Sequence, residues 1–162
     1  MAYGGPVEWG PQQPMGAAYG GLLKRFGARL LDGLIVGITL AIVFSLLPGF
    51  AQAGFLYSAL ATVLYFGYFV VLESSRGCTL GKQLLGLRVA GPAGDSPVTP
   101  DASFRRNAWM LLALLSGFPV IGVLAGLAYL GIVIAIAVTI STHARNQGLH
   151  DRFGGTVVLD RR

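Results

Sequence analysis

The stretch NAWMLLALLSGFPVIGVLAGLAYLGIVIAIAVTIST (107–142) decides the fold class, because its thirty-six residues contain no charged side chain. A helix rises about 1.5 Å per residue, so one uninterrupted helix would reach about 54 Å, whereas the hydrocarbon core of a membrane is only ~30 Å thick. The run therefore lies in a membrane either as one steeply tilted helix or as a helical hairpin. Gly117-Phe118-Pro119 favours the hairpin, because proline removes a helical hydrogen bond and glycine lowers helix propensity.

Two further apolar stretches precede this run. LLDGLIVGITLAIVFSLL (30–47) carries a single charge, Asp32, and extending it back by eight residues gives a helix long enough to cross the hydrocarbon core. A Pro-Gly pair ends this helix, and an uncharged connector leads to FLYSALATVLYFGYFVVL (55–72), which is followed by Glu73. The sequence therefore predicts a transmembrane hairpin.

The composition excludes several classes of protein. Of the 162 residues, 54% are hydrophobic and 12% are charged, about half of the ~25% charge that is usual in soluble domains. The net charge of +5 does not indicate nucleic-acid binding, because the bases are separated by long apolar runs. A single cysteine, Cys78, excludes an internal disulfide framework, and two histidines, His143 and His150, lack zinc-site spacing. We expect no metal, no cofactor and no enzymatic activity.

The first twenty residues differ from the rest of the chain. They are rich in Gly, Pro and Gln, with one acid and no base, so they cannot bury enough apolar surface to offset the entropy of ordering. They are not a signal peptide, because the first base is Lys24 and no basic n-region leads directly into an apolar segment. We expect a disordered cytoplasmic tail over residues 1–20 and a membrane domain over residues 21–162.

Two short stretches outside the apolar runs have the composition of β-strands. LLGLRVA (84–90) lies in the basic loop that follows the first hairpin, and GGTVVLD (154–160) lies near the C-terminus. If the two strands pair, the loop and the C-terminal segment must share one side of the membrane.

The distribution of basic residues leads to the same topology. The twelve bases lie before the first span, in the loop 73–106 and after the long apolar run, whereas the connector between the first two spans has none. Basic flanks stay cytoplasmic, so the long run must cross an even number of times. We predict an all-α plasma-membrane protein with both termini cytoplasmic. Its fold would be a four-helix transmembrane bundle of two helical hairpins with a small two-stranded β element, and its spans would be about 22–47, 54–73, 103–117 and 119–142.

Charged residues gather on one face of the first predicted helix. Arg25, Arg29 and Asp32 lie on this face at helical spacing, and Ala28, on the same face, has a small side chain that allows a neighbouring helix to approach. A buried acid in a membrane span is costly and needs a partner, and Arg29, one turn away, is the nearest candidate. Two interpretations remain open. Asp32 is either an ion or proton site or one half of a structural ion pair near the cytoplasmic interface.

The loop after the second span holds three candidate residues. Glu73 stands at the predicted membrane interface, where a carboxylate is unremarkable. GCTLGKQ (77–83) lacks the glycine spacing and the Ser or Thr after lysine that a phosphate-binding loop requires. We therefore expect its glycines, Gly77 and Gly81, to form turns, and Lys82 to contact anionic lipid.

The C-terminal pair His150-Asp151 has too few partner ligands for a metal-dependent hydrolase. Neither histidine has the partners of a nucleophilic triad. We predict instead a polar clasp, in which Asp151 reaches an arginine such as Arg25, Arg29 or Arg106.

Four separated motifs resemble the RDD family of bacterial integral membrane proteins. These are RFGARLLD (25–32), ESSRGCTLGKQLLGLRV (73–89), RN (106–107) and GLHDRFGGTVV (148–158). The resemblance covers about residues 22–160. It implies that the family arginine is Arg25, with Arg29 as the alternative, and that the two family aspartates are Asp32 and Asp151.

The resemblance also implies a polytopic membrane protein for which transport of ions or small solutes has been suspected. We expect a homo-oligomeric transporter, with a small cation or proton as a possible ligand at Asp32. The alternative is a non-transporting membrane scaffold, in which the same charges lock the helices and the Gly/Pro-rich tail recruits a soluble partner.

Overall fold

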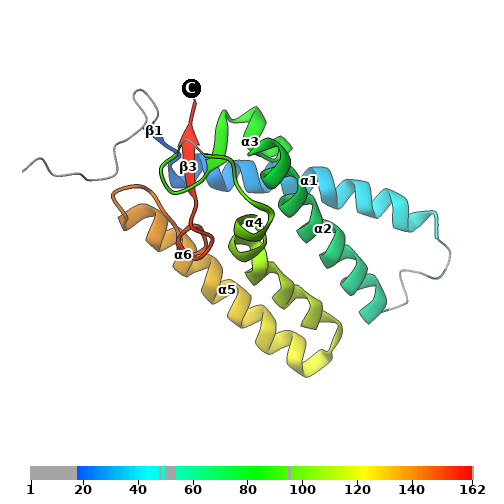
Figure 1. Ribbon diagram of the computed structural model, residues 1–162. Coiled ribbons are helices and arrows are strands. Elements are labelled where there is room, and N and C mark those ends of the chain that lie inside the picture. Colours follow the sequence, from blue (N-terminus) through cyan, green and yellow to red (C-terminus); the bar gives the residue numbers. More distant parts are fainter. Residues whose placement is uncertain (1–17, 48, 50–53, 95, 162) are drawn as a thin grey trace, which may run out of the picture.

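Three long apolar helices dominate the computed structural model, which describes residues 18–47, 49, 54–94 and 96–161 (Figure 1). They are α1 (Leu22–Ser45), α2 (Phe55–Arg76) and α5 (Pro119–Thr142), with 24, 22 and 24 residues. All three are long and apolar enough to cross a membrane. Only 17%, 17% and 6% of their apolar windows are buried, so most of each helix surface is available to lipid.

The fourth predicted span is different from the other three. The chain forms a short polar helix, α4 (Pro100–Asn107), and continues as the ten-residue 3₁₀-helix η2 (Ala108–Gly117). A 3₁₀-helix rises about 2.0 Å per residue, so η2 reaches only about 20 Å of the ~30 Å core. Three candidate spans, and not four, are therefore present among the described residues, and the predicted four-helix count is not confirmed.

The long apolar run does turn back on itself. Phe118 is extended, with φ −106° and ψ 120°, and it separates η2 from α5, which begins at Pro119. The two segments then pack along each other, and η2 also packs on α2. The run is therefore a hairpin and not one tilted helix, as the Gly-Phe-Pro break predicts.

A small antiparallel sheet joins distant parts of the chain. Its strands are β1 (Ala18–Tyr19), β2 (Leu87–Ala90) and β3 (Val157–Asp160), in the order β1-β3-β2. The predicted pairing of the loop strand with the C-terminal strand is confirmed, with Val89 opposite Val158. Strand β1 was not expected: residues 18 and 19 pair with β3, so the predicted tail ends earlier than residue 20. Residues 1–17 of that tail lie outside the described part.

The sheet packs against the beginning of α1. Leu87, Val89 and Val158 form an apolar cluster with Ala28 of α1 and Val98. Two five-residue helices complete this end of the molecule, namely α3 (Leu80–Leu84) and α6 (Leu149–Phe153). We call the sheet together with α3 and α6 the cap. The predicted loop is thus part of a folded cap at one end of the long helices.

The long helices do not close into a compact bundle. α1 makes its main contacts with α3 and meets α5 at only a few positions, whereas α2 and α5 pack on η2. Figure 1 shows α1 diverging from α2 and α5 away from the sheet. Close to the cap, residues of α1 and α5 line a cavity.

Candidate functional site

Three acids are completely buried where the long helices meet the cap. Asp32 of α1, Glu73 of α2 and Asp151 of α6 each have 0% of their surface exposed. A buried carboxylate is costly unless its oxygens are hydrogen-bonded or its charge is paired. The partners of these three acids therefore define the candidate site.

Asp32 is held by neutral donors. Its carboxylate accepts hydrogen bonds from the Tyr68 hydroxyl at 2.6 Å, the Thr79 hydroxyl at 2.6 Å and the backbone N–H of Gly81 at 2.7 Å. These donors come from α2 and from the beginning of α3, so Asp32 ties three elements together. Arg29, the candidate partner considered for Asp32, makes no ion pair with it within 4.0 Å, and the cap brings neutral donors to the carboxylate instead.

Arg29 lies against aromatic rings. Its guanidinium carbon is 3.9 Å from the ring centre of Phe69 and within 5.5 Å of those of Tyr65 and Trp109. Cation–π contacts of this kind stabilise a cation that is partly removed from water. No carboxylate within 4.0 Å pairs with Arg29 among the described residues, and its Nη2 atom is buried without a hydrogen-bond partner there.

Glu73 is the centre of a second network. It pairs with the Lys82 ammonium and with Arg106 Nε at 3.3 Å, and it accepts hydrogen bonds from Asn107 Nδ2 at 2.9 Å and Ser103 Oγ at 3.2 Å. The interpretation of Glu73 as an ordinary interfacial carboxylate is therefore wrong, because α3 and α4 fold over it.

Lys82 is also placed differently from the prediction. It is 8% exposed and pairs with Glu73, so it does not extend toward lipid headgroups as expected. Burial lowers the pKa of the Lys82 ammonium, although Glu73 opposes this shift. Lys82 belongs to the interior network, because α3 packs against α1 and turns this side chain inward.

Asp151 forms the polar clasp between the C-terminal segment and two helices. Its two carboxylate oxygens pair with Arg25 of α1 and Arg106 of α4, and it also accepts a hydrogen bond from the backbone N–H of Gly148 at 3.0 Å. Of the three arginines considered from the sequence, Arg29 is the one not joined to Asp151. Burial alone would raise the pKa of Asp151, but Arg106, His150 and Arg25 hold it below the usual range.

His150 stands beside this clasp, with Nε2 3.2 Å from Asp151 Oδ1. Burial lowers the pKa of His150 to about 3; Asp151 opposes this shift, whereas Arg106 and Arg25 add to it. The imidazole is therefore neutral at physiological pH.

Arg106 connects the two networks, since it pairs with both Glu73 and Asp151. The sequence analysis does not predict the ion pair between Arg106 and Glu73. The available signal was the RN motif (106–107), both of whose residues are buried and contact Glu73.

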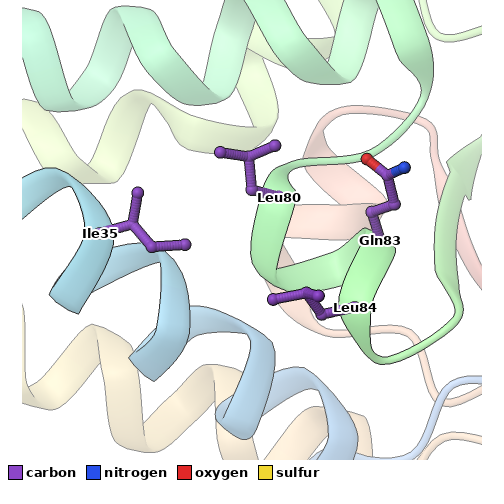
Figure 2. Close-up of a pocket in the computed structure, with 4 residues that line it drawn as sticks. All are labelled: Ile35, Leu80, Gln83 and Leu84. Carbon is purple, nitrogen blue, oxygen red and sulfur yellow. The ribbon is translucent and has the colours of Figure 1, made fainter.

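Two cavities lie beside these networks. One, of about 270 Å³, lies between α1, α5 and the charged cluster, and Arg25, Arg29, Lys82 and Arg106 contribute to its lining. The other, of about 540 Å³, is an open hollow lined by Ile35 of α1 and by Leu80, Gln83 and Leu84 of α3 (Figure 2). Asp32 contributes to the lining of neither. Within the described ranges no group of three or more His, Cys, Asp or Glu side chains is arranged to hold a metal ion.

Comparison with known proteins agrees with this architecture. The RDD family model matches residues 19–155, which includes all three buried acids and the arginines of the clasp. The chain belongs to the RDD family. This RDD-family protein is also 27% identical over 160 residues to the uncharacterized membrane protein YteJ of Bacillus subtilis (strain 168), a match that covers 93% of this chain and 87% of YteJ. No solved structure matches the chain.

Proposed function

We propose that this RDD-family protein is a non-enzymatic scaffold of the plasma membrane, in which buried charges lock the membrane helices to the cap. The observation that carries the proposal is the environment of the Asp32 carboxylate, which is completely buried and accepts three hydrogen bonds. The Gly/Pro-rich sequence before β1 is the segment that would recruit a soluble partner.

The contacts of Asp32 argue against an ion or proton site there. An ion-binding carboxylate needs a path to water, whereas Asp32 is completely buried, accepts three hydrogen bonds and lines neither cavity. Replacing its three donors by a hydrated cation would require the cap to separate from α1. A structural role needs no such movement.

Charge supports a cytoplasmic cap. The strands of the sheet come from before α1, after α2 and after α5, and the basic residues of the chain lie in or next to these same three segments, whereas residues 48–54 contain no charge. Basic flanks remain in the cytoplasm. The proposal therefore has both termini cytoplasmic and four membrane-embedded segments, with η2 as the short one.

A second candidate function is transport of a small solute by an oligomer. The 270 Å³ cavity beside the charged network favours it, because a solute pathway needs open volume next to polar groups. Its four cationic lining residues would repel a cation, so this candidate points to an anionic solute. An oligomer would supply the enclosure that one open set of helices lacks.

Purified protein in liposomes separates the two candidates. Wild-type protein, Asp32→Asn and the exposed control Asp101→Asn would be compared for flux under cation, proton and anion gradients, and for thermal stability in detergent. The scaffold predicts no flux above empty liposomes. It also predicts that Asp32→Asn is less stable by roughly 1–3 kcal/mol, because a buried donor would then face an amide N–H₂, and that the control is close to wild type.

The opposite result would favour transport. Flux by the wild type that disappears in Asp32→Asn, with stability and membrane insertion unchanged, would overturn the scaffold. Flux that persists in Asp32→Asn would place a pathway away from this residue.

A further inference from the structure

The 270 Å³ cavity has a polar end that is rich in cations. Arg25, Lys82 and Arg106 each pair with a buried acid, whereas Arg29 lies against aromatic rings and is in no ion pair among the described residues. Asp32, the nearest acid along α1, is already occupied by neutral donors. Arg29 therefore has no ion-pair partner of its own among the described residues, and the four cations that line the cavity outnumber the three buried acids of the cluster by one.

Several donors at this polar end are unused. Arg25 Nη2, Arg29 Nη2 and Trp109 Nε1 are buried and have no hydrogen-bond partner within the described part of the chain, and all three residues line the cavity. Arg25 is only 8% exposed. Buried polar groups normally find partners, so three unused N–H donors around one space indicate an absent acceptor.

The other end of the cavity is apolar. Tyr129, Val133, Ile136 and Ile140 of α5 form its wall, and α5 is the least buried of the three long helices. Phe26 of α1 stands at the rim and is 64% exposed. An occupant can therefore contact the cations at one end and lie along lipid-facing apolar surface at the other.

The depth of the cations suits a lipid headgroup. Arg29 is seven residues beyond the beginning of α1 at Leu22, which is about 10 Å along the helix axis. This places its guanidinium near the membrane interface on the side of the sheet. The cavity volume of 270 Å³ equals about nine water molecules at ~30 Å³ each, which is room for a headgroup but not for acyl chains.

We propose that this cavity binds the phosphate headgroup of an anionic phospholipid, with the acyl chains lying along α5. Guanidinium groups bind phosphate oxygens through paired, charge-assisted hydrogen bonds, and basic pockets between membrane helices on the cytoplasmic side suit anionic headgroups. Arg29 supplies a cation that has no ion-pair partner among the described residues, while Arg25 and Trp109 supply further donors. The site is separate from Asp32 and does not rest on the scaffold proposal.

Trp109 provides a direct probe of occupancy. The chain has two tryptophans, Trp9 and Trp109, so a Trp9→Phe background leaves one reporter at the cavity. Phosphatidylglycerol with brominated acyl chains, titrated into the detergent-solubilised protein, should quench this fluorescence at lower lipid concentration than brominated phosphatidylcholine. Unlabelled phosphatidylglycerol should relieve the quenching. Inorganic phosphate at millimolar concentration should not.

Three variants in this background test the assignment of residues. Arg29→Gln should weaken the binding of phosphatidylglycerol by about tenfold or more, because a charge-assisted contact is lost. Arg152→Gln, which removes an exposed arginine on α6, is the control for general surface charge and should bind like the parent. Ala137→Phe fills the apolar wall while retaining every cation, and it should also weaken binding.

Two outcomes would overturn the proposal. Equal loss of binding in Arg29→Gln and Arg152→Gln, with Ala137→Phe unchanged, would show a non-specific surface effect. Relief of quenching by inorganic phosphate as effective as that by phosphatidylglycerol would show a site for a free anion. If Arg29→Gln fails to fold, Ala137→Phe still tests the proposal, because it fills the cavity and leaves every charged residue in place.

Discussion

A buried carboxylate is stable when its charge is paired or its oxygens are hydrogen-bonded, and this protein uses both solutions within one cluster. Asp32 is held by hydroxyl and backbone donors, whereas Glu73 and Asp151 are held by cations. Arg106 joins the two ion-paired acids, so changes at either one are expected to affect both. The charges therefore act as one unit.

His150 gives the cluster a predictable dependence on pH. A histidine in the unfolded chain has a pKa near ~6.5, whereas the pKa of His150 in the folded protein is lowered to about 3. Below pH ~6.5 only the unfolded state binds this proton, so folding stability should fall as the pH decreases toward 3 and should be fully present above pH ~6.5.

The expected loss between pH 7 and pH 5 is at most about 2 kcal/mol. Thermal unfolding in detergent across this interval measures it. His150→Gln should flatten the pH dependence, while His143→Gln, which alters a histidine outside the cluster, should retain it. Parallel pH profiles for wild type and His150→Gln would contradict the prediction.

Among the elements, the contact between α1 and α3 positions the cap. A Cβ atom on Gly81 would lie 2.2 Å from the backbone oxygen of Ala28 and 3.0 Å from the Asp32 carboxylate. Only glycine therefore allows α3 to approach α1 closely enough for the Gly81 N–H to bond Asp32. The expected role of Gly77 in a turn is confirmed by its φ of +72° at the end of α2, whereas Gly81 lies within α3 and serves helix packing.

We predict that Gly81→Ala destabilises the protein by about 1–3 kcal/mol, because the clash is with backbone and cannot be relieved by a side-chain rotation. Gly126→Ala is the matched control, since a Cβ there meets nothing within 4 Å, and alanine favours a helix over glycine. Helical circular dichroism during thermal unfolding in detergent gives both values. Equal stability of the two variants would show that α3 can move away from α1 at no cost.

At the scale of the whole molecule, the sheet determines how the chain passes through the membrane. Strands from the N-terminal segment, the loop and the C-terminal segment pair with one another, so these three segments lie at the same end of the helices. In the topology that we propose, each apolar stretch between them crosses the membrane and returns. α1 and α2 do so as two long helices, and η2 and α5 do so as one short and one long segment.

Cysteine labelling in intact cells tests this topology. In a Cys78→Ser background, Gly49→Cys and Phe118→Cys should react with a membrane-impermeant maleimide added outside. Ser96→Cys and Arg161→Cys should react only after permeabilisation. Labelling of Ser96→Cys from outside would reverse the orientation, and protection of Phe118→Cys from both sides would indicate a re-entrant hairpin instead of four crossings.

The sequence by itself determined the membrane class, the three long spans, the turn at Gly117-Phe118-Pro119 and the location of the two predicted strands. Length of apolar sequence, helix-breaking residues and β-branched runs are local properties, and they act before any tertiary contact forms. The 3₁₀ geometry of η2 has no such signal, because its apolar residues suit an α-helix equally well.

Only the tertiary structure decided which charges meet. Asp32 bonds Thr79 and Gly81, which are 47 and 49 residues away, and Arg25 pairs with Asp151 across 126 residues. Helical spacing indicated Arg29 as the partner of Asp32, because spacing relates only residues of the same helix. The folded cap supplies neutral donors to the aspartate, and Arg29 lines the cavity without an ion-pair partner among the described residues.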